Sequence, residues 1–110
     1  MKVTVNELLK LEGFSPVVIT DGEAEVKGVY IGDLLSWVMG RACEGDAWIT
    51  IMSNINILAV ATLSDVACII LAEGVELSED IKTAAKDKGI NIICSEKSAY
   101  DIAVALSKAL

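Results

Sequence analysis

The most continuous apolar pattern of the chain lies between residues 45 and 72, where two aliphatic segments enclose a polar turn and a third apolar segment. Ala47–Met52 and Val66–Leu71 are apolar along both faces, which is typical of strands in a sheet that helices cover on both sides. The segment between them, Ile55–Leu63, has the length and composition of a buried helix. A strand, a helix and a second strand in this order predict a parallel α/β unit.

A third strand and two further helices follow the same plan. Ile90–Cys94 is the third aliphatic segment, and Glu79–Lys88 and Ala99–Ala109 are predicted helices. Each of these helices follows a serine that can cap it, Ser78 in one case and Ser98 in the other. Right-handed crossovers between parallel strands bring the carboxyl ends of all three strands to one edge of the sheet.

The N-terminal part of the chain predicts a short helix and a hairpin. Thr4 and Glu7 form a capping box at the start of the helix. The Asp21-Gly22 pair, between Val17–Thr20 and Glu23–Gly28, predicts a β-hairpin.

A helix is also predicted from Leu34 to about Arg41, with Asp33 as its N-cap. Taken together, residues 1–110 predict a single small three-layer α/β domain with a mostly parallel central sheet. The sheet is built from consecutive β-α units, and an N-terminal helix and β-hairpin are added to it. A chain of 110 residues, 54% of them hydrophobic, is large enough to bury a core of its own.

Polar residues follow each of the three predicted parallel strands, at the place where α/β domains bind ligands. Free N–H groups at a helix start favour anions, Gly74 permits close backbone approach, and Lys97 offers a positive charge. We therefore predict a site for a small anionic or nucleotide-like ligand at these turns. Its residues are Thr50, Ser53, Asn54 and Asn56 after the first strand, Gly74 after the second, and Ser95, Lys97 and Ser98 after the third. The alternative is that Ser53, Asn54 and Ser98 only cap helices in solvated turns.

No catalytic constellation accompanies these residues. The chain has no histidine, which excludes a histidine-based triad and a histidine-ligated metal site. Phosphate loops of the GxxxxGK[ST] or GxGxxG type are absent from the sequence. Asp33, Asp46 and Asp65 lie beside predicted element boundaries, where capping or turn formation accounts for them. The one pairing of a nucleophile with a base near the predicted site is Ser95 or Ser98 with Lys97, and its spacing is only a weak signal for catalysis. The sequence therefore predicts a non-catalytic protein without a metal or cofactor.

Sixteen acidic and nine basic residues give the chain a formal net charge of −7. Nucleic-acid and anionic-membrane surfaces need clustered Lys and Arg, so this balance argues against both partners. Asp65 interrupts Ile55–Ala72, the one apolar stretch of nearly membrane-spanning length. Cys43, Cys68 and Cys94 lack the CxxC spacing and indicate free thiols. Residues 1–7 turn polar too soon for a signal peptide, so we expect a cytoplasmic protein.

Three sequence blocks together resemble the DRTGG domain family. They are Gly28–Met39, which contains Asp-Leu-Leu-Ser, Gly45–Thr50, which reads Gly-Asp-Ala-Trp-Ile-Thr, and Asn56–Ala61, which reads Asn-Ile-Leu-Ala-Val-Ala. The resemblance covers roughly residues 28–110, although Glu25–Val29 lacks the paired glycines of the eponymous motif. The family is similar to the amino-terminal domain of HPr kinase/phosphorylase and, more distantly, to the uridine-binding domain of Mur ligases. The resemblance implies a regulatory or ligand-sensing module, with no catalytic residues to carry over.

We therefore expect a domain that binds the small ligand and signals to an unidentified protein partner. The alternative is a protein-interaction or scaffold domain without a small-molecule ligand. A homodimer is also expected, because a small monomer does not readily bury the hydrophobic excess together with Trp37 and Trp48.

Overall fold

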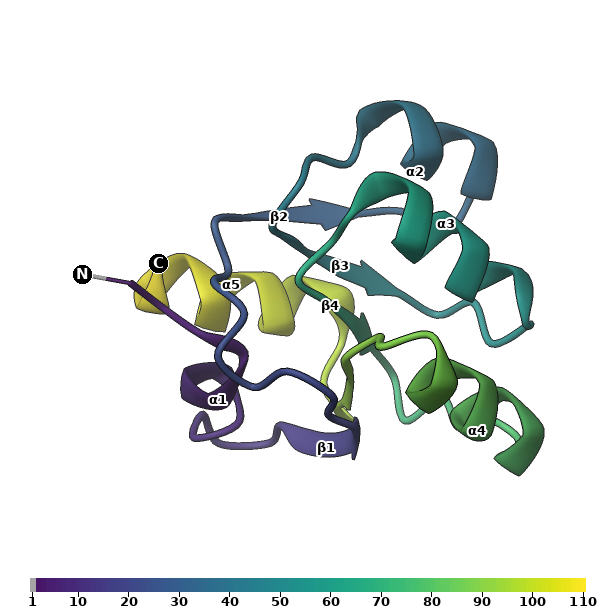
Figure 1. The fold of residues 1–110 in the computed structure, drawn as a ribbon. Helices are drawn as coiled ribbons and strands as arrows, with labels where there is room; N and C mark the ends of the chain where they lie inside the picture. The colour runs from purple at the N-terminus through teal and green to yellow at the C-terminus, as the bar shows by residue number, and fades with distance from the viewer. Residues whose placement is uncertain (1) are drawn as a thin grey trace.

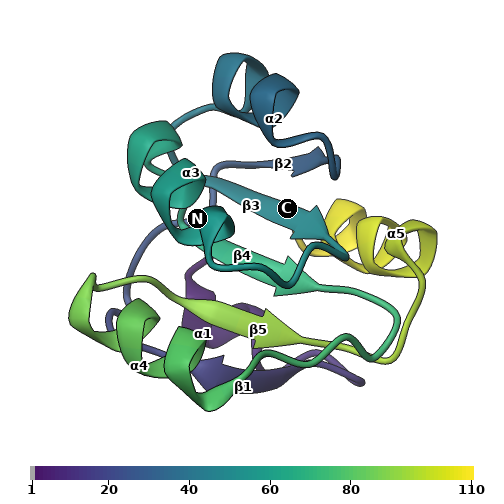
Figure 2. The ribbon, with the colours of Figure 1, turned by 90° about the vertical axis from the view of Figure 1, so that its right-hand side faces the viewer.

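A five-stranded sheet in the order β1-β5-β4-β3-β2 forms the centre of the protein, seen in a computed structural model that describes residues 2–110 (Figures 1 and 2). The strands are β1 (Ser15–Val18), β2 (Gly28–Ile31), β3 (Asp46–Thr50), β4 (Cys68–Leu71) and β5 (Ile92–Cys94). Strands β2, β3, β4 and β5 run parallel, and β1 is antiparallel to β5. The parallel arrangement predicted for the three aliphatic segments is confirmed, and β2 extends it by a fourth strand.

Helices cover both faces of the sheet. The three that join successive parallel strands, α2 (Leu35–Arg41), α3 (Asn56–Ser64) and α4 (Glu79–Asp87), contribute to one core layer. The short α1 (Val5–Leu8) and the C-terminal α5 (Ala99–Ala109) contribute to the other layer (Figure 2). The predicted three-layer α/β architecture is therefore confirmed. Within residues 2–110, none of the helices combines the length and the apolar character needed to cross a membrane.

Successive side chains of each central strand enter opposite layers. In β3, Ala47 and Ile49 pack in the layer of α1 and α5, whereas Trp48 packs in the layer of α2 and α3. In β4, Ile70 and Ile69 divide in the same way. All five residues are fully buried. Burial on both faces explains why these strands carry an apolar residue at nearly every position.

The chain reverses at Asp21-Gly22 as predicted, but the two arms of this hairpin pair with other segments. The amide of Ala24 donates to the carbonyl oxygen of Asp21 at 3.2 Å and closes the turn. Before the turn, β1 pairs with β5; after it, Glu25 forms a bridge with Thr4, and β2 joins β3 at the opposite edge of the sheet. Turn residues specify a reversal of the chain and leave the partners of the flanking segments open.

Asp33 does not cap α2, so that prediction is wrong. The helix begins after Leu34, and no side chain caps it. Instead, Asp33 Oδ1 accepts hydrogen bonds from Thr50 Oγ1 at 2.8 Å and from the Ile51 amide at 3.0 Å. This carboxylate therefore ties the end of β2 to the end of β3.

The two tryptophans have different environments. Trp48 is fully buried, and its indole Nε1 donates to the carbonyl oxygen of Gly32 at 2.9 Å. Trp37 is 55% exposed, and the guanidinium of Arg41 lies 4.1 Å from its ring centre. Of the two tryptophans, only Trp37 is therefore left exposed and still supports the expected homodimer.

Candidate functional site

The turn after β4 and the turn after β5 form one unit. The amide of Glu73 donates to the carbonyl oxygen of Lys97, and the amide of Gly74 donates to that of Ser95, each at 2.9 Å. Ser95 also donates its own amide to the carbonyl oxygen of Leu71 at 2.9 Å. Adjacent parallel strands end at the same edge, so their turns meet there, as the sequence predicted for this pair.

The backbone at Glu73 and Gly74 has left-handed conformations, with φ of 61° and 72°. A Cβ on Gly74 would overlap the carboxylate of Glu96. Glycine at this position therefore serves two needs, since it accepts a positive φ and leaves room for Glu96 beside the turn.

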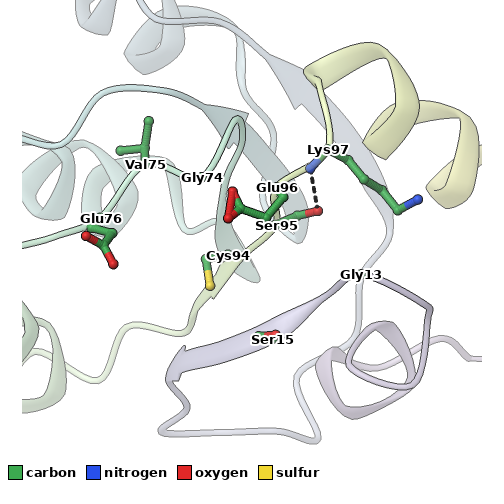
Figure 3. A pocket seen from close by; sticks show the side chains of 9 residues that line it. All are labelled: Gly13, Ser15, Gly74, Val75, Glu76, Cys94, Ser95, Glu96 and Lys97. Carbon is green, nitrogen blue, oxygen red and sulfur yellow. Dashed lines mark hydrogen bonds between the residues drawn. The ribbon is translucent and has the colours of Figure 1, made fainter.

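A cavity of about 460 Å³ opens between these turns and the start of β1 (Figure 3). Its lining comes from three places in the sequence: Gly13 and Ser15; Gly74, Val75 and Glu76; and Cys94, Ser95, Glu96 and Lys97. In Figure 3, Glu76 and Cys94 lie on one side, and the Lys97 side chain extends away from Glu96 on the other. The antiparallel pairing of β1 with β5 sets Ser15 opposite Cys94 and so supplies the third wall.

The charged groups of this lining are two carboxylates, Glu76 and Glu96, and one ammonium, Lys97. Partial burial raises the pKa of the Cys94 thiol, and the charge of Glu96 raises it further. The thiol therefore keeps its proton at neutral pH and gives the cavity a neutral, weakly polar wall. An excess of acceptor oxygens over cations suits ligand groups that donate hydrogen bonds, such as hydroxyls.

Three of the predicted site residues line the cavity: Gly74, Ser95 and Lys97. Ser95 is 4% exposed, and its Oγ accepts from the Lys97 amide at 3.1 Å, which shapes the turn. Ser98 caps α5 instead, because its Oγ accepts from the Asp101 amide at 3.1 Å. The Ser98 side chain therefore caps a helix, which is the alternative to ligand binding that the sequence left open.

The residues predicted after β3 do not line this cavity. Thr50 is buried against Asp33, and Asn54 Oδ1 accepts from the Asn56 amide at 2.9 Å. Ser53 and Asn56 are exposed. All four do lie at the same sheet edge as the cavity, because β3 is parallel to β4 and β5. However, β4 separates β3 from β5, so the turn after β3 is not a wall of the cavity.

Sequence reasoning missed several lining residues. Glu96 lies inside a predicted turn and Cys94 inside a predicted strand. Their place at the end of the third strand indicated the site, but Glu96 was interpreted only as a turn residue and Cys94 only as a core residue. Gly13 and Ser15 carried no such signal, because only the long-range pairing of β1 with β5 brings them to the site.

The aspartates considered as acids or bases have structural roles: the side chains of Asp33 and Asp46 accept from backbone amides, and Asp65 caps a helix through its backbone. Asp46 Oδ2 accepts from the Cys43 amide at 2.8 Å, and Asp65 ends α3 in a left-handed conformation with φ of 54°. Over the described residues 2–110, no group of three or more Cys, Asp or Glu side chains is arranged to hold a metal ion.

Residues 15–109 match the family model of the DRTGG domain. This range contains all five strands and the helices α2 to α5. It begins earlier than the resemblance seen in the sequence, which started near residue 28. A search among curated proteins gave no match.

Among solved structures, the chain is similar to the CBS and DRTGG domains of the regulatory region of a Clostridium perfringens pyrophosphatase, complexed with the activator diadenosine tetraphosphate. The TM-score is 0.74 at 18% sequence identity, and the match covers 96% of this chain. It covers 45% of the other chain, so this protein corresponds to about half of that regulatory region. At this identity the similarity concerns the fold.

Proposed function

The chain belongs to the DRTGG domain family, and on that basis we propose that it is a non-catalytic regulatory domain that senses a small nucleotide-like ligand and signals to a protein partner. The cavity at the carboxyl ends of β4 and β5 is the observation that carries the proposal. Open parallel sheets bind ligands outside the carboxyl ends of their strands. A volume of about 460 Å³ lies within the usual range for small-molecule sites.

The charges of the lining indicate which part of a nucleotide the cavity would take. Carboxylates such as Glu76 and Glu96 accept hydrogen bonds from ribose hydroxyls, a role that acidic residues have in dinucleotide-binding folds. Lys97 is the one cation of the lining and can pair with a single phosphate. We therefore expect a nucleoside, or the nucleoside end of a nucleotide, rather than a run of phosphates. The nucleotide activator of the similar regulatory region supports this ligand class.

A cytoplasmic location and self-association belong to the same proposal. The three cysteines are free, which suits a reducing compartment. Trp37, exposed on a small domain, supports a homodimer.

A thermal-shift screen against nucleosides and nucleotides tests the ligand. A ligand present at about 100 times its Kd adds about 2.7 kcal/mol to the free energy of unfolding, which raises Tm by on the order of 10 °C. We expect Glu96→Gln to reduce this rise while leaving the Tm of the free protein nearly unchanged, because Glu96 is exposed and glutamine keeps its shape.

Ser53→Ala is the matched control, because Ser53 lies at the same sheet edge but outside the cavity. It should bind like the wild type. If no compound raises Tm in the folded protein, the ligand-sensing proposal fails. If Ser53→Ala abolishes binding and Glu96→Gln does not, the site lies after β3 instead.

A protein-interaction domain without a small ligand is the second candidate function. Exposed apolar side chains on α2 and α3, among them Trp37 and Leu63, favour it. The two candidates separate in the same screen, because a pure interaction domain gains no stability from any nucleoside or nucleotide.

A further inference from the structure

The outward face of α3 carries exposed apolar residues beside the exposed polar Asn56 and Thr62, although this helix lies at the surface. Ile55, Ala59 and Leu63 follow one another at four-residue spacing and so form one stripe, which we call the α3 stripe. Ile55 is 53% exposed and Leu63 is 73% exposed, and Ala59 between them is also exposed. The inward face, with Ile57 and Val60, is buried. Large apolar side chains on the outward face of a helix are ordinarily covered by another element or another chain.

Helix α4 provides the contrast, because it lies in the same layer (Figure 1). Its exposed positions are mostly charged: Glu79, Asp80, Thr83, Lys86 and Asp87. By comparison, residues 47–64, which include all of α3, contain no charged residue. The acidic residue nearest in sequence to the α3 stripe is Asp65, which caps the end of α3 two residues after Leu63.

We propose that two copies of this chain meet at the α3 stripe, with α3 packed antiparallel against α3 of the second copy about a two-fold axis at Ala59. This inference rests on the homodimer of the proposed function and identifies the surface through which the two copies would associate. A two-fold contact must be complementary to itself. In this arrangement Ala59 faces the second Ala59, and Ile55 faces Leu63 of the other copy. The small side chain at the centre lets the helix backbones approach, and the large ones fill the space on either side.

Charge selects a second copy as the occupant. Two chains that each carry a net charge of −7 repel one another, and a contact surface free of acidic residues adds least to this repulsion. The α3 stripe is such a surface. It also has no Lys or Arg that would attract an acidic protein or an anionic lipid. What fits it is another uncharged apolar face, and this chain presents one.

The available area suits a stable contact. The large apolar side chains that are about half exposed or more at the end of β2, on α2 and α3, and in the turns before these helices include Ile31, Leu34, Trp37, Ile51, Ile55 and Leu63. With about 200 Å² for each fully exposed side chain, they offer on the order of 700 Å². Each partner in a standard interface gives about 800 Å².

Light scattering during size-exclusion chromatography, at high micromolar concentration, tests the surface. We expect a dimer for the wild type and a monomer for Ala59→Glu, with the dimer Kd raised by on the order of 100-fold or more, because like charges then oppose one another. Thr83→Glu on α4 is the matched control and should remain dimeric. Far-UV circular dichroism verifies that each variant is folded, and Leu63→Ser provides a second disruption at a more exposed position.

A mixture of Ala59→Glu and Ala59→Lys chains tests the two-fold arrangement. Because the two positions face one another, the mixture should form a 1:1 dimer although neither variant dimerises alone. A monomeric wild type overturns both the homodimer and the surface. A dimer that survives both Ala59→Glu and Leu63→Ser overturns the surface alone. Failure of the mixture to dimerise overturns the antiparallel register. Ligand sensing is judged separately, by the Tm rise of the Ala59→Glu protein with nucleosides.

Discussion

Asn91 holds the backbone of Asp21 with both ends of its side-chain amide. Its Oδ1 accepts from the Asp21 amide, and its Nδ2 donates to the Asp21 carbonyl oxygen, each at 2.9 Å. The same side chain also accepts from the Thr20 amide at 2.8 Å and donates to the Ala67 carbonyl oxygen at 3.0 Å. Asn91 is 4% exposed. A single buried amide therefore fixes the turn after β1 to the start of the central strands.

Replacement of Asn91 by alanine should destabilise the protein markedly. The change removes the hydrogen-bond partner of backbone groups of Thr20, Asp21 and Ala67, of which Ala67 is buried. A buried group left unsatisfied costs about 1–3 kcal/mol, and the lost bonds to the part-buried turn add to this. We expect a loss of about 3 kcal/mol in the free energy of unfolding, measured by urea denaturation. Asn56→Ala, at an exposed position, is the control and should change stability by less than about 0.5 kcal/mol. An Asn91→Ala protein as stable as the wild type would contradict this role.

Gly74→Ala and Gly89→Ala should destabilise the protein by similar amounts but differ in their effect on the cavity. Both glycines have positive φ, of 72° and 73°, so alanine at either costs about 1 kcal/mol. Nothing lies near a Cβ at Gly89, whereas one at Gly74 displaces the flexible Glu96 carboxylate. Urea denaturation measures the stability, and the nucleoside-dependent Tm rise measures the cavity. Only Gly74→Ala should reduce that rise; an equal reduction in both variants would show that the effect is not local.

Thr50→Val tests the bond between the ends of β2 and β3. Valine keeps the shape of threonine but removes the hydroxyl that donates to Asp33 and accepts from the Met52 amide at 3.2 Å. We expect a loss of about 1–2 kcal/mol in the free energy of unfolding. A double-mutant cycle with Asp33→Ala should show a coupling energy of on the order of 1 kcal/mol. Strict additivity of the two single losses would argue that the two side chains act independently.

Stability should fall at high pH because of Cys68. Burial raises the pKa of this thiol from its ordinary value of 9.0 to about 12. Between these values the unfolded chain loses the proton and the folded chain keeps it, so the unfolded state binds fewer protons. The contribution of Cys68 is therefore fully present below pH 9 and is lost as the pH rises toward 12, at about 1.4 kcal/mol per pH unit once the unfolded thiol is ionised.

Cys68→Val isolates this contribution, because it removes the thiol and keeps an apolar side chain in the core. Urea denaturation across this pH range should show a shallower fall in stability for the variant than for the wild type. Thiol alkylation gives a second measurement: in the folded protein the exposed Cys43 should react first and the buried Cys68 last. Equal pH dependence in the two proteins would show that other groups cause the fall.

The parallel sheet was predictable because it depends on local composition. Ala47, Ile49 and Ile70 belong to aliphatic segments with no polar face, and only strands covered on both sides tolerate such segments. The pairing of β1 with β5 was not predictable, because the turn at Asp21-Gly22 does not determine which strand the segment before it pairs with.

The site was predictable only where the two strands that form it are neighbours. Gly74, Ser95 and Lys97 line the cavity because β4 and β5 are adjacent and their turns must meet. Thr50 does not line it, and the sequence does not reveal that Asp33 binds its hydroxyl. Ser15 was missed because its place in the site comes from the strand order, which the sequence leaves open.

The backbone bonds between Glu73 and Lys97 and between Gly74 and Ser95 have a mechanical consequence. One of these turns leads to α4 and the other to α5, and the two helices lie on opposite faces of the sheet. A shift of either turn alone would strain or break these two bonds. If the proposed ligand displaces Glu96, it therefore acts on a pair of joined turns, one leading to each face of the sheet.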